Sequence, residues 1–345
     1  MAIAERIRVP VSAEELRRRL DRLPRFHLTD LPTPLHELPN LSAALDGPRV
    51  FMKREDLTQW GLGGNKNRKF QFEVGDALAQ GCDVLVWGGG AAQSNHARQC
   101  AAAARRAGLD VVLLLNRGPH ADLRQGNRLL LDLMDADVRI TGRDSLFGTD
   151  VELDRIAADL RGRGRRPYVI RYGPLTAVGY VECLLEIIQQ AAAAGFAPAR
   201  IYVCSGGGTQ AGLELGKRAL GLTVEIRGYT PVRVEGGRAP QQAHIATMAA
   251  EGLGLDVRFD AKDFWNSDAQ VGPGYAEVTP AAVEAIRLVA RTEGIFLEPV
   301  YTGKAFAGLL HDLRAGDWPR HEPVVFVHTG GLPLVFTYAE ELARR

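Results

Sequence analysis

The chain has 345 residues, of which 46% are hydrophobic and 24% charged, a composition typical of a globular protein large enough for two lobes. Its 42 basic and 41 acidic residues leave a formal net charge of +1, which argues against a general electrostatic grip on nucleic acid or an anionic membrane. No stretch reaches the ~18 consecutive apolar residues that a membrane helix needs, and the charged N-terminus lacks the apolar core of a secretory signal. We therefore expect a cytoplasmic protein without membrane or nucleic-acid partners.

A single rhythm of β-rich run, turn and helical segment dominates the chain. After a helix that begins at Lys66 and runs through Leu78, it predicts strands over 83–87, 110–115, 137–140, 167–171, 201–204, 224–229 and 324–327, and helices over 94–107, 123–135, 150–160, 178–194, 209–219 and 280–292. Such alternation implies an α/β fold with parallel sheets covered by helices on both faces. We expect a smaller lobe near 67–172, inserted into a larger lobe formed by 1–66 and 173–345.

The four cysteines are widely separated and form neither a CxxC pair nor a metal-ligand spacing: Cys82, Cys100, Cys183 and Cys204. This spacing predicts small buried thiols in a reducing compartment. No metal site is expected from the sequence.

A glycine-rich segment follows the predicted strand 201–204. Ligands of open parallel sheets bind at the carboxyl ends of strands, where helix N-termini present N–H groups. Three glycines let the backbone approach an anion, and a threonine then opens the next helix. A phosphate cradle and an ordinary tight turn both remain open for these residues: Ser205, Gly206, Gly207, Gly208 and Thr209.

The glycines after strand 83–87 fit a dinucleotide site poorly. Gly88 begins a segment that starts like GxGxxG, but Gln93 occupies the third glycine position. Asn116 and Arg117 stand where an acidic residue is expected, and no GxxxxGK[ST] occurs. A nicotinamide dehydrogenase is therefore a weak alternative.

Lys66 follows two glycines and an asparagine at the start of a predicted helix. The positive end of a helix dipole disfavours the ammonium form, which suits a Schiff-base amine. Taken alone, a lysine beside Arg68 and Lys69 is more often surface charge.

Ser94, Asn95 and His96 stand at the start of another predicted helix. Ser94 is an ordinary N-cap candidate, while the free N–H groups there, with the Ser94 and Asn95 side chains, can also hold a substrate carboxylate. For His96, capping or packing competes with proton transfer.

Eight segments together resemble the D-cysteine desulfhydrase and 1-aminocyclopropane-1-carboxylate deaminase family of pyridoxal-phosphate enzymes. In chain order they read LPTPLHELPNLS, FMKREDL, GGNKNRK, QSNHARQ, SGGGTQAG, GPGY, EPVYTGKA and HTGGLP. The resemblance implies the two-lobed, three-layer α/β/α architecture of fold type II, like the tryptophan synthase β subunit. It also implies pyridoxal 5′-phosphate as cofactor, a small amino acid as substrate, and a homodimer.

By this resemblance Lys66 carries the cofactor, and Ser205 to Thr209 bind its phosphate. Asn95 would hold the ring hydroxyl, and Ser94 would lie by the substrate carboxylate or move a proton. Other matching positions are His96 and Tyr275 near the substrate, Tyr301 as the second active-site tyrosine, Thr302 facing the pyridine nitrogen, and Thr329 nearby. Outside the motif match, the tyrosines would be read as packed aromatics and the threonines as caps.

The implied reaction is an α,β-elimination that gives pyruvate, ammonia and sulfide. The family's deaminase branch resembles VYEGK and SNQ, whereas this chain has VYTGK and SNH. A hydroxyl at Thr302 cannot enforce a protonated pyridine nitrogen, and elimination of a good leaving group tolerates this. Cyclopropane deamination, L-cysteate sulfo-lyase action, β- or γ-replacement and a non-catalytic cofactor binder remain alternatives.

The chain also departs from the family. VWGGGAA stands where a TAG-like turn is usual, and Trp60 and Trp265 either border the substrate pocket or simply pack. Arg98 and Arg117 could serve a sulfonate substrate or be ordinary surface charges.

Overall fold

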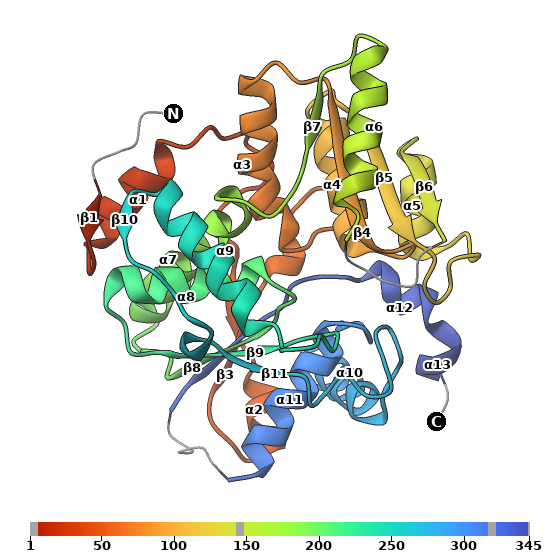
Figure 1. Ribbon diagram of the computed structural model, residues 1–345. Helices are drawn as coiled ribbons and strands as arrows, with labels where there is room; N and C mark the ends of the chain where they lie inside the picture. Colours follow the sequence, from red (N-terminus) through yellow and green to blue (C-terminus); the bar gives the residue numbers. More distant parts are fainter. Residues whose placement is uncertain (1–5, 143–147, 317–321, 344–345) are drawn as a thin grey trace. The chain divides into compact units, whose positions relative to one another are not determined.

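The computed structural model of the protein describes residues 6–142, 148–316 and 322–343 (Figure 1). The expectation of no secretory signal concerns a segment whose first five residues lie outside this part. Two compact units are formed. Unit 1 contains the described residues of 1–22, 31–57 and 173–332, and unit 2 those of 23–30, 58–172 and 333–345.

Unit 1 is built on a six-stranded sheet with the order β11–β9–β8–β12–β3–β2, parallel except for the pair β2–β3. Its strands are β2 (Leu35–Glu37), β3 (Val50–Lys53), β8 (Arg200–Cys204), β9 (Glu225–Tyr229), β11 (Trp265–Ser267) and β12 (Val324–Val327). A separate parallel pair joins β1 (Ile7–Arg8) to β10 (Leu255–Asp256). The helices are α1 (Ala13–Asp21), α2 (Pro39–Leu45), α7 (Leu175–Ala193), α8 (Gly208–Leu220), α9 (Ala239–Gly252), α10 (Pro280–Glu293) and α11 (Thr302–Arg314), with short 3-10 helices at Glu55–Leu57 and Ala261–Asp263.

Helices cover both faces of this sheet. On one face, apolar residues of α7 and α8 join Ile201, Val203 and Val325 in one buried cluster. On the other, α11 packs Phe306 against Phe326 of β12, with ring centroids 4.9 Å apart. Neighbouring residues of a strand point to opposite faces, so β12, which is packed on both faces, is apolar and buried throughout.

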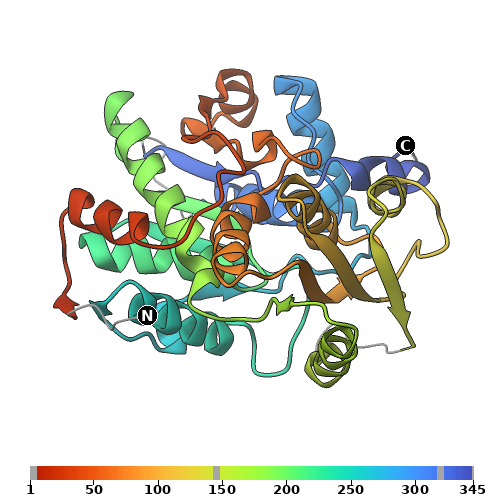
Figure 2. The ribbon, with the colours of Figure 1, turned by 90° about the horizontal axis from the view of Figure 1, so that it is seen from above.

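Unit 2 has a four-stranded parallel sheet with the order β6–β5–β4–β7. Its strands are β4 (Val84–Ala91), β5 (Asp110–Asn116), β6 (Asp137–Thr141) and β7 (Pro167–Val169), and its helices are α3 (Lys66–Ala79), α4 (Asn95–Arg106), α5 (Gly126–Leu133), α6 (Asp150–Gly162), α12 (Pro333–Thr337) and α13 (Ala339–Ala343). Leu85 and Leu113 pack with residues of α3 and α4, whereas Val86 and Val112 pack with residues of α6. Figure 2 shows the helices of this unit on both sides of its sheet. The three-layer α/β prediction is thus confirmed.

The predicted elements all occur, with ends that differ by a few residues. The main difference lies in β4, which continues through the glycines after Trp87 instead of turning there. The register of β4 with β5 shifts between Gly88 and Ala91, so the glycines form an irregular strand end. A Cβ at Gly88 would lie 2.8 Å from Thr149 Oγ1, which explains why no side chain stands there.

The unit boundaries differ from the predicted 66/67 division in three segments. Residues 58–66 belong to unit 2 because Asn67 of α3 donates to Thr58 Oγ1 and to the Trp60 carbonyl. Residues 23–30 follow because Leu28 enters the core of unit 2. The C-terminal segment joins it through Thr337, whose hydroxyl approaches Gln93 Oε1. Sequence patterns do not reveal such long-range packing.

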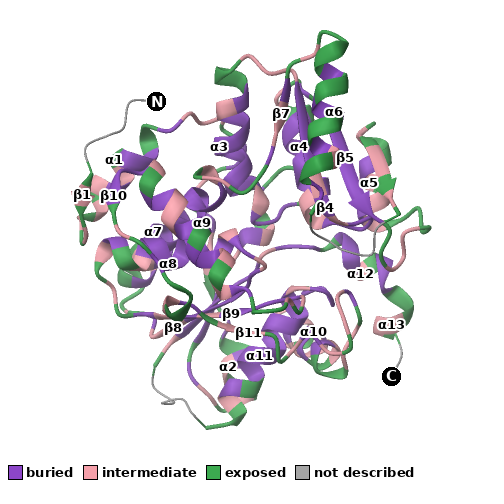
Figure 3. Ribbon diagram, in the orientation of Figure 1, coloured by how far each residue is buried: buried purple, intermediate pink, exposed green. Residues whose placement is uncertain are grey.

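In Figure 3 buried residues, drawn in purple, make up most of β4, β5, α4 and α11, and exposed residues, drawn in green, recur along α6. Among the described residues, no helix is long and apolar enough to span a bilayer.

Candidate active site

The residues predicted for the site fall into two sets, one in each unit. Unit 2 contains Lys66, Ser94, Asn95 and His96, and unit 1 contains Ser205 to Thr209, Tyr275, Tyr301, Thr302 and Thr329.

Lys66 is the first residue of α3. Its N–H donates to Gln99 Oε1 at 2.9 Å, and its Nζ donates to Asn65 Oδ1 at 2.9 Å. Lys66 is half-buried, and the neighbouring Arg68 and Lys69 are buried. The segment is therefore not the solvated surface charge that its local sequence would favour.

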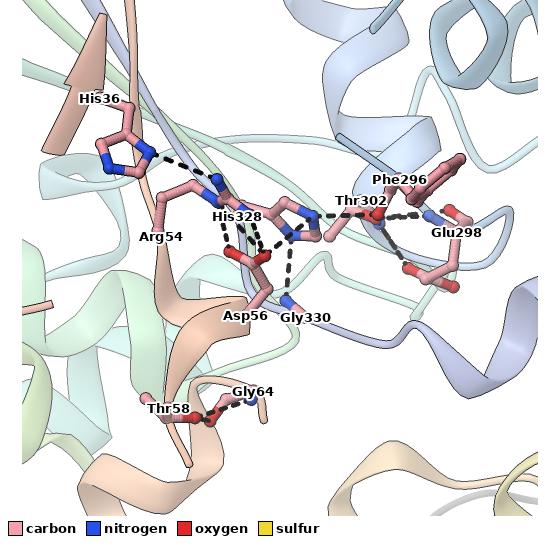
Figure 4. A network of polar contacts seen from close by, with 10 residues as sticks. All are labelled: His36, Arg54, Asp56, Thr58, Gly64, Phe296, Glu298, Thr302, His328 and Gly330. Atoms are coloured by element: carbon pink, nitrogen blue, oxygen red, sulfur yellow. Dashed lines mark hydrogen bonds and ion pairs between the residues drawn. The ribbon is translucent and has the colours of Figure 1, made fainter. Parts of the chain in front are cut away.

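The loop before Lys66 is held in a tight turn by Thr58. The hydroxyl of Thr58 donates to the Gly64 carbonyl and accepts from the Gly64 N–H, both at 2.8 Å (Figure 4). Gly64 has a φ of 126°, and an added Cβ would lie 2.5 Å from Gln99 Nε2. Only glycine fits between this loop and Gln99.

Ser94 and Asn95 begin α4 directly after β4. The Ser94 hydroxyl accepts the Ala97 N–H at 3.2 Å, a standard N-cap. Gln99, which receives the Lys66 N–H, also donates to the Asn95 carbonyl at 3.0 Å. Lys66 and Asn95 are thus joined through one side chain on the first turns of α4.

Arg98 and Asn127 hold Asn95 and the loop before Lys66 through hydrogen bonds. Arg98 is fully buried and donates to Asn127 Oδ1 at 2.7 Å and to the Gly63 carbonyl at 3.0 Å. Asn127 in turn donates to Asn95 Oδ1 at 2.8 Å. This chain of hydrogen bonds orients the Asn95 side chain and the loop before Lys66.

His96 is stacked on Trp87, with ring centroids 4.1 Å apart, and meets Phe70 edge-on. Burial, followed by the charges of Lys69 and Lys66, lowers the pKa of His96 well below 6.5. The imidazole is therefore neutral at pH 7. Its buried Nε2 has no hydrogen-bond partner among the described residues.

The glycine loop of unit 1 lies at the carboxyl end of β8 and leads into α8. Ser205 Oγ accepts the N–H groups of Gly207 and Gln210, at 3.2 and 3.0 Å, and so holds the turn itself. A Cβ at Gly206 would meet only Arg238 Nη2, at 3.8 Å, and this guanidinium donates to the Gly206 carbonyl. The loop therefore presents bare backbone, a helix N-terminus and an arginine in one place.

The HTGG segment follows β12, the neighbour of β8, so Thr329 lies at the same edge of the sheet. His328 is buried, and its Nδ1 accepts the Gly330 N–H at 3.2 Å (Figure 4). Nε2 then carries the proton and donates to the Phe296 carbonyl at 3.1 Å, with Asp56 Oδ2 3.9 Å away. Burial lowers the pKa of His328, so this histidine is a neutral structural tie.

Thr302 is fully buried in the first turn of α11. Its hydroxyl donates to Glu298 Oε1 at 3.1 Å and accepts the Glu298 N–H at 2.9 Å (Figure 4). Glu298 also receives the N–H groups of Val300, Tyr301 and Thr302. Thr302 thus makes the capping contacts expected of a threonine at a helix start. Its role toward the pyridine nitrogen of the cofactor stays a prediction.

Tyr275 and Tyr301 form a pair, with hydroxyl oxygens 2.5 Å apart and rings nearly perpendicular. Burial raises the pKa of Tyr275 to about 12 and the pKa of Tyr301 well above 10. Both phenols are therefore protonated at neutral pH, and one donates to the other.

Three supporting residues escaped prediction. Gln99 and Glu298 stand inside the segments QSNHARQ and EPVYTGKA, but the resemblance gave neither of them a role. Asn127 lies outside the quoted segments, and its partners Arg98 and Asn95 are distant from it in sequence. Arg117, proposed as a sulfonate ligand, forms an exposed ion pair with Asp122.

Trp60 and Trp265 are both partly exposed, and each carries an arginine on its ring, Arg106 and Arg227 respectively. Their place in a substrate pocket stays a prediction. Within the described ranges, no cluster of His, Cys, Asp and Glu is arranged to bind a metal ion.

Comparison with known proteins gives concordant matches. The family described as "Pyridoxal-phosphate dependent enzyme" matches residues 27–330. The chain is 40% identical over 330 residues to a "D-cysteine desulfhydrase" of Klebsiella pneumoniae (strain 342), covering 94% of this chain and 98% of the relative. A protein of the same name from Salmonella choleraesuis (strain SC-B67) is 41% identical over 326 residues, covering 92% and 97%. A crystal structure of an "ACC deaminase homologue" superposes with a TM-score of 0.85 at 35% identity, over 96% of this chain and 99% of that one.

Proposed function

The chain belongs to the pyridoxal-phosphate dependent enzymes, and from that premise we propose that it degrades a small amino acid, with D-cysteine as the first candidate. The products would be pyruvate, ammonia and sulfide. The observation that carries this proposal is the match, over nearly the whole length, to relatives named D-cysteine desulfhydrase.

The donor set in unit 1 suits the cofactor's phosphate. The first-turn N–H groups of α8 have no acceptor within their helix, and a dianion at a helix N-terminus is favoured by the dipole. The bare backbone at Gly206 and the nearby Arg238 add space and positive charge. We assign the phosphate to the segment from Ser205 to Thr209, with Ser205 acting through the turn that its hydroxyl holds.

The donor set in unit 2 suits the attachment point. Lys66 at the start of α3 is half-buried, and its Nζ contacts the neutral amide of Asn65. We assign Asn95 to the ring hydroxyl, Ser94 and His96 to the substrate, and Thr302 to the pyridine nitrogen, with Thr329 nearby.

Pyridoxal phosphate, when bound, supplies the electron sink that makes the substrate's α-carbon acidic. Lys66 would hold the cofactor, and its Nζ would be the base that accepts the α-proton. Tyr275 and Tyr301 are protonated, so we assign to them delivery of a proton to the departing sulfur. The N–H groups at the start of α4 orient the substrate carboxylate.

The closest competing function is opening of 1-aminocyclopropane-1-carboxylate, which the 35% identity to an ACC deaminase homologue supports. SNH and VYTGK stand here in place of the deaminase branch's SNQ and VYEGK. L-cysteate sulfo-lyase action and β- or γ-replacement share the same first steps and are separated by the assay below.

The test compares purified wild type, Lys66→Ala and the matched control Lys262→Ala, whose lysine is 82% exposed. We expect a bound-cofactor absorbance band near the visible range in wild type and control, and its loss or shift in Lys66→Ala. If all three spectra agree, the assignment of Lys66 is wrong.

Turnover is then measured as pyruvate and ammonia from D-cysteine, L-cysteine, L-cysteate, β-chloro-D-alanine and 1-aminocyclopropane-1-carboxylate. We expect pyruvate from D-cysteine. A cofactor band without product from any of the five would refute simple elimination and indicate replacement chemistry.

A further inference from the structure

Lys304 is a buried cation held by backbone carbonyls. It stands in the first turn of α11 with 1% of its surface exposed. Its Nζ donates to the Val271 carbonyl at 2.6 Å and to the Gly274 carbonyl at 3.2 Å. Burial lowers its pKa from the ordinary 10.5. Burying an ammonium group costs free energy, and the two hydrogen bonds to backbone carbonyls offset part of that cost. They also hold the backbone of the segment that supplies the carbonyls.

Both acceptors belong to the loop that carries Tyr275. This loop bends twice through the left-handed region, at Gly272 (φ 73°) and at Ala276 (φ 64°). A Cβ at Gly272 would lie 2.3 Å from Thr279 Cγ2, so the first bend is closely packed. The Val271 carbonyl lies just before the first bend, four positions before Tyr275, and the Gly274 carbonyl lies between the bends, one position before Tyr275.

The start of α11 also contacts this loop at a second point, through Tyr301. Tyr301, three residues before Lys304, meets the Tyr275 hydroxyl at 2.5 Å. Glu298 fixes the Tyr301 backbone through the N–H at 2.9 Å. The Tyr275 side chain is therefore set by two contacts from one helical turn, one to its hydroxyl and one to the backbone that carries it.

We propose that Lys304 is a positioning residue for Tyr275, an inference that rests on the role of Tyr275 in the proposed function. The ammonium group fixes the loop at two carbonyls and thereby fixes the hydroxyl–hydroxyl contact of the tyrosine pair. A methionine of similar length would remove the ammonium donor from both carbonyls, leaving the Gly274 carbonyl, among the described residues, with only the long contact to the Glu277 N–H at 3.4 Å, and the loop would open to let water reach them.

The test is a double-mutant cycle with Lys304→Met and Tyr275→Phe, and with Lys262→Met as the matched exposed-lysine control. We expect Lys304→Met to lower kcat by about 10- to 100-fold, the scale of a small misplacement, with KM little changed. In the Tyr275→Phe background the same substitution should add less than about twofold, because the group it positions is gone. Equal losses in both backgrounds would overturn the proposal.

Hydrogen–deuterium exchange of the full-length protein, with and without cofactor, gives a readout independent of turnover. We expect faster exchange in Lys304→Met for a peptide covering 271–276 and unchanged exchange for one covering 245–252 of α9. Unchanged exchange at 271–276 would refute the proposal that Lys304 holds this loop in place. If Lys304→Met does not fold, Lys304→Gln, which keeps one donor, enters the same cycle with smaller expected changes.

The outcomes separate the two proposals. Full activity of Tyr275→Phe alone would refute the catalytic role of Tyr275, and with it the positioning role of Lys304 in catalysis. Faster exchange of residues 271–276 in Lys304→Met would then show that Lys304 stabilises the loop without contributing to catalysis.

Discussion

Arg98 shows how one residue's surroundings decide its use. Its guanidinium is fully buried, and burial lowers the pKa of Arg98 to about 9. Two of its nitrogens are committed to Asn127 and to the Gly63 carbonyl. Arg98 therefore supports the loop before Lys66. These contacts indicate a structural role and not direct binding of a sulfonate substrate.

Arg98→Lys tests this assignment. A lysine cannot reproduce the forked contacts, so we expect unfolding stability to fall by about 2–4 kcal/mol, measured as the urea midpoint. Arg117→Lys, at an exposed ion pair, should change stability by less than about 0.5 kcal/mol. A selective rise of KM for L-cysteate in Arg98→Lys, with unchanged stability, would instead favour the sulfonate role.

At the scale of elements, the loop from Thr58 to Asn65 packs closely against the first turns of α4. The loop approaches α4 most closely at Gly64, because any side chain at this position would collide with Gln99. Gln99 is also the residue that accepts the Lys66 N–H. We expect Gly64→Ala to displace Gln99 and to weaken cofactor binding about tenfold or more, measured by absorbance titration.

Gly164→Ala is the matched control in the same unit. It has a φ of 77° with nothing within 4 Å of an added Cβ, so it shares the backbone strain without the clash. We expect it to cost about 1 kcal/mol of stability and to leave cofactor affinity unchanged. Equal affinity losses in both variants would mean that strain, and not the contact with Gln99, is responsible.

The start of α11 depends on Glu298. Burial raises the pKa of Glu298 to about 7, although the amides it accepts act in the opposite direction. Because this value exceeds the ordinary 4.5, the folded protein keeps a proton that the unfolded chain releases between pH 4.5 and 7. The stability contributed by this group is thus complete below pH 4.5 and is lost as the pH rises to 7.

Glu298→Gln should flatten the dependence of stability on pH in that window, measured by urea unfolding at several pH values. It should also lower stability by about 1–3 kcal/mol, since an amide N–H would then face backbone N–H donors. Glu235→Gln, at an exposed position, is the control and should keep the wild-type slope. An unchanged slope in Glu298→Gln would show that this carboxyl does not titrate between pH 4.5 and 7.

At the scale of the whole molecule, both units place their candidate residues where parallel strands end. Ser94 follows β4 of one sheet, and the glycine loop and Thr329 follow the adjacent β8 and β12 of the other. Parallel neighbours end at the same edge, which explains why segments more than 100 residues apart, such as 205–209 and 328–331, belong to one edge.

A homodimer is the expected assembly, by resemblance to the family. Sedimentation velocity should then give a particle of twice the chain mass of 37.5 kDa. A single species at the chain mass over the micromolar range would contradict this expectation.

The sequence by itself determined the α/β alternation, the helix start at Lys66 and the glycine loop before α8. These depend on local signals: apolar runs, caps and glycines act over a few residues. The order of the motifs along the chain was also sufficient to indicate the family, which the comparisons confirm.

Tertiary structure alone decided which polar residues are buried and what they hold. Arg98 with Asn127, Gln99 with Lys66, and Lys304 with the loop of Tyr275 each join residues about 30 positions apart. It also moved residues 58–66 and 333–343 into unit 2. A charged or amide side chain looks the same in sequence whether solvated or buried, because only packing supplies the partner that makes its burial possible.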